Sequence, residues 1–177
     1  MRTTSASHCA RAGTRDGSTD AGVIEAQLAH STGAEQVAAI EDHGVAKQPP
    51  YAIEVGHESF ACPEFVEIAR KANVAIVWCE QESRTPIADR TADFAYLRCK
   101  TLLADQPKGY SPQDIGRIAN LCHVWAAGEA PGGLPYAGDP VDSRGPGGDV
   151  FAFMINGAKE RAPAAALALA EKLNEDR

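Results

Sequence analysis

The stretch Val74-Ala-Ile-Val-Trp-Cys79 decides the fold class, because nearly all of its residues are apolar. A strand covered on both faces of a parallel sheet has such a continuous apolar pattern. Three further runs with β-strand character lie around it, at 51–55, 94–98 and 150–155. Helical patterns separate these runs, so the order strand, helix, strand, strand, helix, strand, helix predicts an α/β fold with parallel strands.

Three helices are expected between and after these strands. One begins at Pro63 and one near Pro163, since proline suits the first turn of a helix. The middle helix has the clearest start, where Ser111 can cap the helix and Pro112 occupies its first turn. Its apolar stripe ends at Gly128, which is a typical helix stop.

The chain divides into three parts by composition. Residues 1–21 have too little apolar content to pack and are expected to form a disordered leader. Residues 22–44 show a weakly helical pattern of uncertain origin, and residues 45–177 carry the organised α/β domain. Within that domain, glycine and proline dominate 131–148, which is expected to be a flexible loop.

Composition limits the classes of function. The chain has 177 residues, of which 44% are hydrophobic and 23% charged, and a net charge of −7. An acidic balance argues against nucleic acid and anionic membranes as partners. The five cysteines form no CxxC pair and no zinc-type cluster, so no metal is expected. With no secretory signal at the N-terminus either, the expected location is the cytoplasm.

Candidate site residues follow from strand ends, because ligands of parallel α/β folds gather at the carboxyl edge of the sheet. Each predicted strand leaves the sheet through a charged or amide side chain. A carboxylate inside a strand is costly unless it is paired or hydrated, so Glu54 attracts attention. It is the candidate general acid/base. The candidate ligand-binding residues are His57, Glu80, Arg98, Asn156 and Lys159.

Each candidate also has a purely structural interpretation. Glu54 could form an ion pair with Arg98 or Lys100, because buried charges survive by pairing, and the two interpretations are evenly balanced. His57 lies outside the strand and could be an ordinary loop residue. Glu80 could be a solvated loop residue, and the residues after the last strand could be surface caps of the following helix.

Four ordered phrases carry a family resemblance. They are Tyr51-Ala-Ile-Glu-Val-Gly-His-Glu-Ser-Phe60, Asn73-Val-Ala-Ile-Val-Trp78, Thr91-Ala-Asp-Phe-Ala-Tyr-Leu-Arg98 and Asn156-Gly-Ala-Lys-Glu-Arg-Ala-Pro163. Together they resemble the C-terminal half of the domain of unknown function 72 family, the YecE-like proteins, over roughly residues 45–177. The resemblance implies a TIM-type β/α barrel, here present as its last four strands. It implies no established activity and no known cofactor.

The matches and departures fall on particular residues. The family pattern has an arginine at the place of Gly56, an acidic residue at Gly157 and an aspartate at Glu80. Its Arg-x-His-Gly continuation is replaced by Arg98-Cys99-Lys100-Thr101. Positions that match are Glu54, Ser59, Asp93, Tyr96, Arg98, Asn156, Lys159 and Pro163.

Three hypotheses about function remain open. The first is a truncated or diverged β/α-barrel protein that binds a small polar or anionic ligand at its strand ends, where the last two strands of a complete barrel often hold phosphate. The second is a non-catalytic half barrel that self-associates or completes a partner through exposed sheet edges and an apolar inner face. The third is a non-functional truncated product.

Overall fold

The strands form where the apolar runs predict them. The computed structural model describes residues 9–12, 22–25, 51–81, 84–140 and 147–175. The four predicted strands appear as β3 (Tyr51–Glu54), β4 and β5 (Ala75–Ile76 and Trp78–Glu80), β6 (Ala95–Cys99) and β7 (Val150–Met154). The α/β class with parallel strands is therefore confirmed.

The helices begin at the predicted residues. They are α2 (Pro63–Lys71), α3 (Pro112–Ala126) and α4 (Ala162–Glu175), with short 3₁₀ turns η2 (Glu58–Phe60) and η3 (Lys159–Arg161). Ser111 caps α3, because its Oγ accepts a hydrogen bond from the Asp114 amide at 3.1 Å. After α3 the chain turns at Gly128, whose φ of 84° favours glycine.

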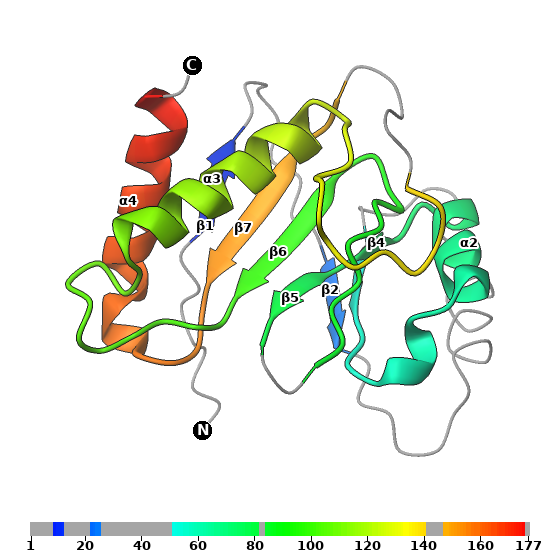
Figure 1. Cartoon of the computed structure of the whole chain (residues 1–177), viewed down its shortest axis with the longest axis horizontal. Coiled ribbons are helices and arrows are strands. Elements are labelled where there is room, and N and C mark those ends of the chain that lie inside the picture. Colours follow the sequence, from blue (N-terminus) through cyan, green and yellow to red (C-terminus); the bar gives the residue numbers. More distant parts are fainter. Residues whose placement is uncertain (1–8, 13–21, 26–50, 82–83, 141–146, 176–177) are drawn as a thin grey trace.

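The strands form two sheets that meet at one bent strand. Their orders are β2-β3-β4 and β1-β7-β6-β5, where β2 is Gly22–Glu25 and β1 is Cys9–Ala12. All pairs are parallel except β1 with β7. β4 and β5 follow one another directly, and the intervening Val77 amide donates to the Ile53 carbonyl at 2.9 Å. The described strands do not close on themselves, which fits part of a barrel (Figure 1).

Side chains alternate between two faces of these sheets. On the outer face, α3 and α4 cover β5, β6 and β7, and α2 covers β3 and β4 (Figure 1). The opposite face, called the inner face below, carries the cluster Ala52, Ala75, Val77, Ala92, Phe94, Tyr96 and Phe151. Residues 75, 77 and 79 therefore point inward and residues 76, 78 and 80 point outward.

The N-terminal segment differs from the prediction at eight residues. Strand β1 lies within the leader 1–21 that was expected to be disordered, and β2 lies at the start of the lead-in 22–44 that was expected to be helical. Both strands exist through pairing with distant partners, β7 and β3. Composition and local periodicity carry no information about such pairing. The other residues of 1–44 lie outside the described part of the chain.

The glycine- and proline-rich segment 131–148 was expected to be a flexible loop. Over 131–140 it forms hydrogen bonds with residues 88 and 89. The Asp89 carboxylate accepts hydrogen bonds from the Ala137 amide at 2.7 Å and the Gly138 amide at 3.1 Å. The Ala88 amide donates to the Pro135 carbonyl at 2.9 Å. Residues 141–146 lie outside the described residues.

The inner face is not an open apolar surface, which corrects one expectation for a half barrel. Phe94, Tyr96 and Phe151 are all buried. The rings pack on one another, with Phe94 edge-on to Phe151 at 5.7 Å and Tyr96 stacked on Phe153 at 4.8 Å. Among the described residues, the large hydrophobic side chains that are exposed are Leu103 and Leu167, and neither belongs to this face.

No helix within the described residues is long and apolar enough to cross a membrane.

Two leucines of α4 provide a matched test of the outer core. Leu169 is 0% exposed, whereas Leu167 on the same helix is 66% exposed. Leu169→Ala should lower the free energy of unfolding by about 3 kcal/mol, since it leaves a cavity in the core. Leu167→Ala should change it by less than about 0.5 kcal/mol. Urea denaturation measures both, and equal losses would contradict this packing of α4 on the sheet.

Candidate functional site

A buried carboxylate at the carboxyl end of β3 is the centre of the site. Glu54 is the last residue of β3 and its side chain is 3% exposed. It points to the inner face, because it follows Ala52 by two residues. Such a burial is tolerable only when cations and hydrogen bonds replace the lost water.

Three cationic side chains converge on Glu54. Lys100 Nζ lies 2.5 Å from Oε1, and Arg84 Nη1 lies 3.0 Å from the same oxygen. Arg98 Nη1 donates to Oε2. Two of these cations come from β6 and the residue after it, and Arg84 comes from the segment between β5 and β6. The predicted pairing of Glu54 with Arg98 and Lys100 is thus present, and Arg84 is added to it.

Burial and pairing oppose one another in setting the charge of Glu54. Burial alone raises the pKa of its carboxyl group, but the hydrogen bond from Lys100 and the charges of Arg98 and Lys100 outweigh burial. The net effect lowers the pKa below its ordinary value of 4.5. Glu54 is therefore ionised at neutral pH and is a poor proton donor. Its oxygens already serve three cations, which also makes it a weak base, so the geometry favours an organising role over the expected acid/base role.

A thiol completes the cluster. Cys79 is buried and is the register partner of Arg98. Burial and then the charge of Glu54 raise the pKa of the thiol, and these effects outweigh Lys100 and Arg84. Cys79 is therefore protonated at neutral pH.

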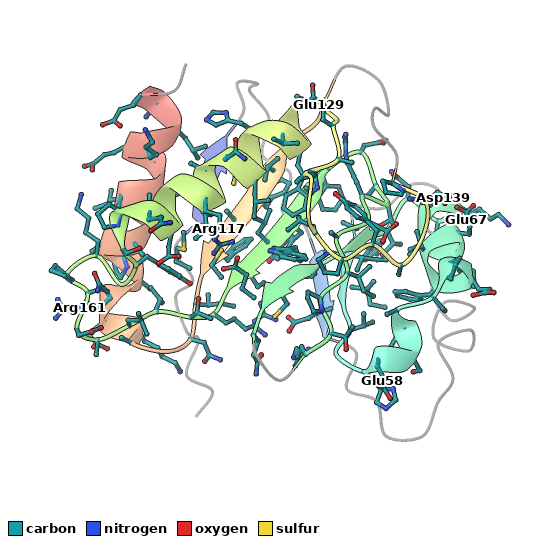
Figure 2. All side chains as sticks on the ribbon, in the orientation of Figure 1. Glu58, Glu67, Arg117, Glu129, Asp139 and Arg161 are labelled. Atoms are coloured by element: carbon teal, nitrogen blue, oxygen red, sulfur yellow. The ribbon has the colours of Figure 1, made fainter. Side chains whose placement is uncertain are left out.

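Glu80 lies on the other face of the sheet. As residue 80 it points outward, and its Oε1 accepts from Arg117 Nη1 of α3 at 2.5 Å. This hydrogen bond raises the pKa of the guanidinium. Figure 2 labels Arg117 on α3, the helix that covers the outer face. Glu80 therefore does not lie beside Glu54, because side chains alternate in direction along a strand, and a ligand role for Glu80 stays a prediction.

His57 has a local role. His57 caps η2, since its Nδ1 accepts a hydrogen bond from the Ser59 amide at 3.2 Å. The same Nδ1 lies 2.8 Å from Ser59 Oγ. The side chain is exposed, and its partner is Ser59 rather than the Glu54 cluster. Figure 2 shows the neighbouring Glu58 at the outer end of this turn. A ligand role for His57 receives no support from this geometry.

The last two predicted ligand residues follow β7. Asn156 and Lys159 are exposed, and Asn156 has a φ of 67° that suits a tight turn. The adjacent Gly157 has a φ of 62°, and a Cβ there would overlap the Leu102 carbonyl oxygen. An acidic side chain, as the family pattern has, does not fit at position 157. The structure gives neither Asn156 nor Lys159 a contact with Glu54.

Position 56 explains the presence of Arg84. Where the family pattern has an arginine, this chain has Gly56, and a Cβ at that position would lie 2.9 Å from Arg84 Nη1. Arg84 thus fills the space beside Gly56. Sequence reasoning missed Arg84 because it lies in a polar loop without periodicity. Cys79 was not singled out either, because its run is apolar on both faces; the alternation from Ala75 in the structure places it inward.

Glu25 is a further residue that the sequence did not single out. It is the register partner of Glu54 across the parallel pair β2 and β3. Its backbone therefore lies at the same edge of the sheet. Among the described residues, no group of three or more His, Cys, Asp or Glu side chains could hold a metal ion.

Comparison with known proteins gives the chain its family. The family model described as "Protein of unknown function DUF72" matches residues 10–177. The chain belongs to the DUF72 family. The match starts well before residue 45, where the resemblance in the sequence was expected to begin, so the segment that carries β1 and β2 also belongs to the family region. No curated protein matches.

Two solved structures share the fold. Both are crystal structures of a DUF72 family protein from Enterococcus faecalis V583, with TM-scores of 0.60 and 0.58 and sequence identities of 17% and 16%. Each comparison covers 87% of this chain but only 61% or 58% of the other. This DUF72 chain thus spans about three-fifths of the length of those proteins.

The charge of Glu54 can be tested by pH. Because its folded pKa is lowered, its stabilising effect is complete above pH 4.5 and is lost as the pH falls below that value. Glu54→Gln should lower the free energy of unfolding by about 2 kcal/mol at pH 7, since it removes the carboxylate charge that pairs with three cations. The difference from wild type should shrink between pH 4.5 and pH 3 in urea denaturation.

The exposed Glu58→Gln variant is the control and should match wild type at both ends of the pH range. A Glu54→Gln deficit that stayed constant down to pH 3 would show that the ionised carboxylate is not what stabilises the fold.

Proposed function

We propose that this DUF72 protein binds a small oxyanion, a carboxylate or phosphate group, at the Glu54 cluster. The observation that carries the proposal is the convergence of three cations on one buried carboxylate. One cation is enough to neutralise a carboxylate, and each further buried cation costs desolvation energy. The N–H groups of the cations on the solvent side can bind the oxygens of an anionic ligand.

The burial of Lys100 supports this assignment. Its side chain is 8% exposed, and its charge is shared with Glu54 Oε1, which Arg84 also contacts. Lysine side chains are rarely buried unless they are paired with a negative charge. Arg98 and Arg84 are 18% and 33% exposed, so the cluster is open to solvent on the arginine side. Guanidinium groups match carboxylate and phosphate oxygens in pairs.

Position in the fold points the same way. The cluster lies on the inner face at the carboxyl edge of parallel strands, which is where ligands of such sheets bind. Binding rather than catalysis is proposed because Glu54 is held ionised and fully engaged by its partners. An acid/base function would need a group with a pKa near neutral pH.

Binding of inorganic phosphate and of acetate, followed by isothermal titration or NMR, tests the proposal. Lys100→Met should weaken binding at least tenfold, because without Lys100 the carboxylate of Glu54 must keep Arg84 as its partner on Oε1. Lys108→Met is the matched control, since Lys108 is exposed and paired with Glu171 on another surface. Equal affinity in wild type and Lys100→Met would place any bound anion elsewhere.

A second candidate is a half barrel that is completed by a second copy of itself. The chain covers only 61% of a solved relative, and its described strands leave the sheets unclosed. Sheet edges then invite pairing with another chain. Analytical ultracentrifugation should show a concentration-dependent dimer if this candidate holds, whereas a well-folded monomer at all concentrations contradicts it.

A further inference from the structure

We infer that Arg84 is the residue that binds the oxyanion. We infer further that Gly56 determines the specificity of the site, because its lack of a side chain leaves space for the Arg84 guanidinium. This inference rests on the proposed function and deepens it. It assigns separate roles to the three cations, and it gives a reason for the glycine two residues after Glu54.

Gly56 is required for space and not for backbone conformation. A Cβ at this position would lie 2.9 Å from Nη1, 3.2 Å from Cζ and 3.3 Å from Cδ of Arg84. All three of its nearest atoms thus belong to one side chain. Gly56 is not among the glycines with positive φ, so alanine fits the backbone there. Any side chain at position 56 must therefore displace the guanidinium.

Arg84 is the cation that Glu54 can most easily release. Its Nη1 shares Oε1 with Lys100, which lies closer at 2.5 Å against 3.0 Å. Arg98 serves the other oxygen. If Arg84 turns to a ligand, the carboxylate of Glu54 still has two cationic partners.

Solvent exposure also sets Arg84 apart from the other two cations. Arg84 is the most exposed of the three, and Lys100 is the most buried. A guanidinium carries five N–H donors in a planar fork, and the contact with Glu54 involves one nitrogen. The rest of the fork can bind two oxygens of a carboxylate or phosphate group. Arg84 therefore binds the oxyanion, while Lys100 and Arg98 neutralise the charge of Glu54.

The full-length chain should be titrated with inorganic phosphate and with acetate, as wild type, Gly56→Ala, Arg84→Ala and the double variant. Each single variant should bind the phosphate about tenfold more weakly. The double variant should be no weaker than Arg84→Ala, because both changes remove the same group. Gly132→Ala is the matched control, since a Cβ there meets nothing within 4 Å and no positive φ is involved.

Arg84→Lys is the second variant, for the case that Gly56→Ala does not fold. It keeps the charge but loses the fork, so it should also weaken phosphate binding. The ¹⁵N resonance of the Arg84 guanidinium should shift on adding phosphate to wild type, a readout that a merely structural arginine would not give.

The possible outcomes separate the two proposals. If wild type binds neither anion, the proposed function fails. If wild type binds but Gly56→Ala and Arg84→Lys bind equally well, the function stands and the role of Arg84 is overturned. Additive losses in the double variant would also overturn it, since Gly56 would then act independently of Arg84.

Discussion

The arrangement of this protein depends on one buried negative charge, the carboxylate of Glu54. It sits at the end of β3, and its three cationic partners come from β6, from the residue after β6 and from the segment before it. β3 belongs to one sheet and β6 to the other, so the ion cluster links two sheets that otherwise meet through the bent strand of β4 and β5. Placing that charge inside requires the cations, and for this reason three of them gather at this edge of the sheet.

The elements of residues 51–175 could be predicted because each has a local signal. The run Val74–Cys79 is apolar on both faces, and the Ser111-Pro112 pair is a typical helix start. Cys9–Ala12 and Gly22–Glu25 have no such signal. They are strands because β7 and β3 offer them unpaired backbone groups, and pairing between distant segments cannot be deduced from the composition of one of them.

The site could be predicted only in part, for a related reason. Glu54 ends β3 and Arg98 lies next to the end of β6, and the parallel strands β4 and β5 lie between them, so both residues come to the same edge. Glu80 also stands at a strand end, but the alternation of side chains sends it to Arg117 on the outer face. The run Val74–Cys79 does not show which of its residues point inward, because it is apolar on both faces. The structure settles this by placing Ala75 and Val77 in the inner cluster. The carboxyl ends of the strands show at which edge of the sheet a site lies. The alternation of side chains between the two faces decides which residues at that edge point into the site.

The departures from the family pattern have geometric reasons of two kinds. At Gly157 the backbone itself excludes a side chain, because φ is positive and the Leu102 carbonyl lies against it. At Gly56 the backbone would accept a side chain, and what excludes it is Arg84. The first glycine is fixed by the turn after β7, whereas the second leaves space that a cation from a different loop occupies. In this chain the guanidinium beside Glu54 on that side comes from Arg84, so the site is described better by the positions of its charges in space than by a local motif.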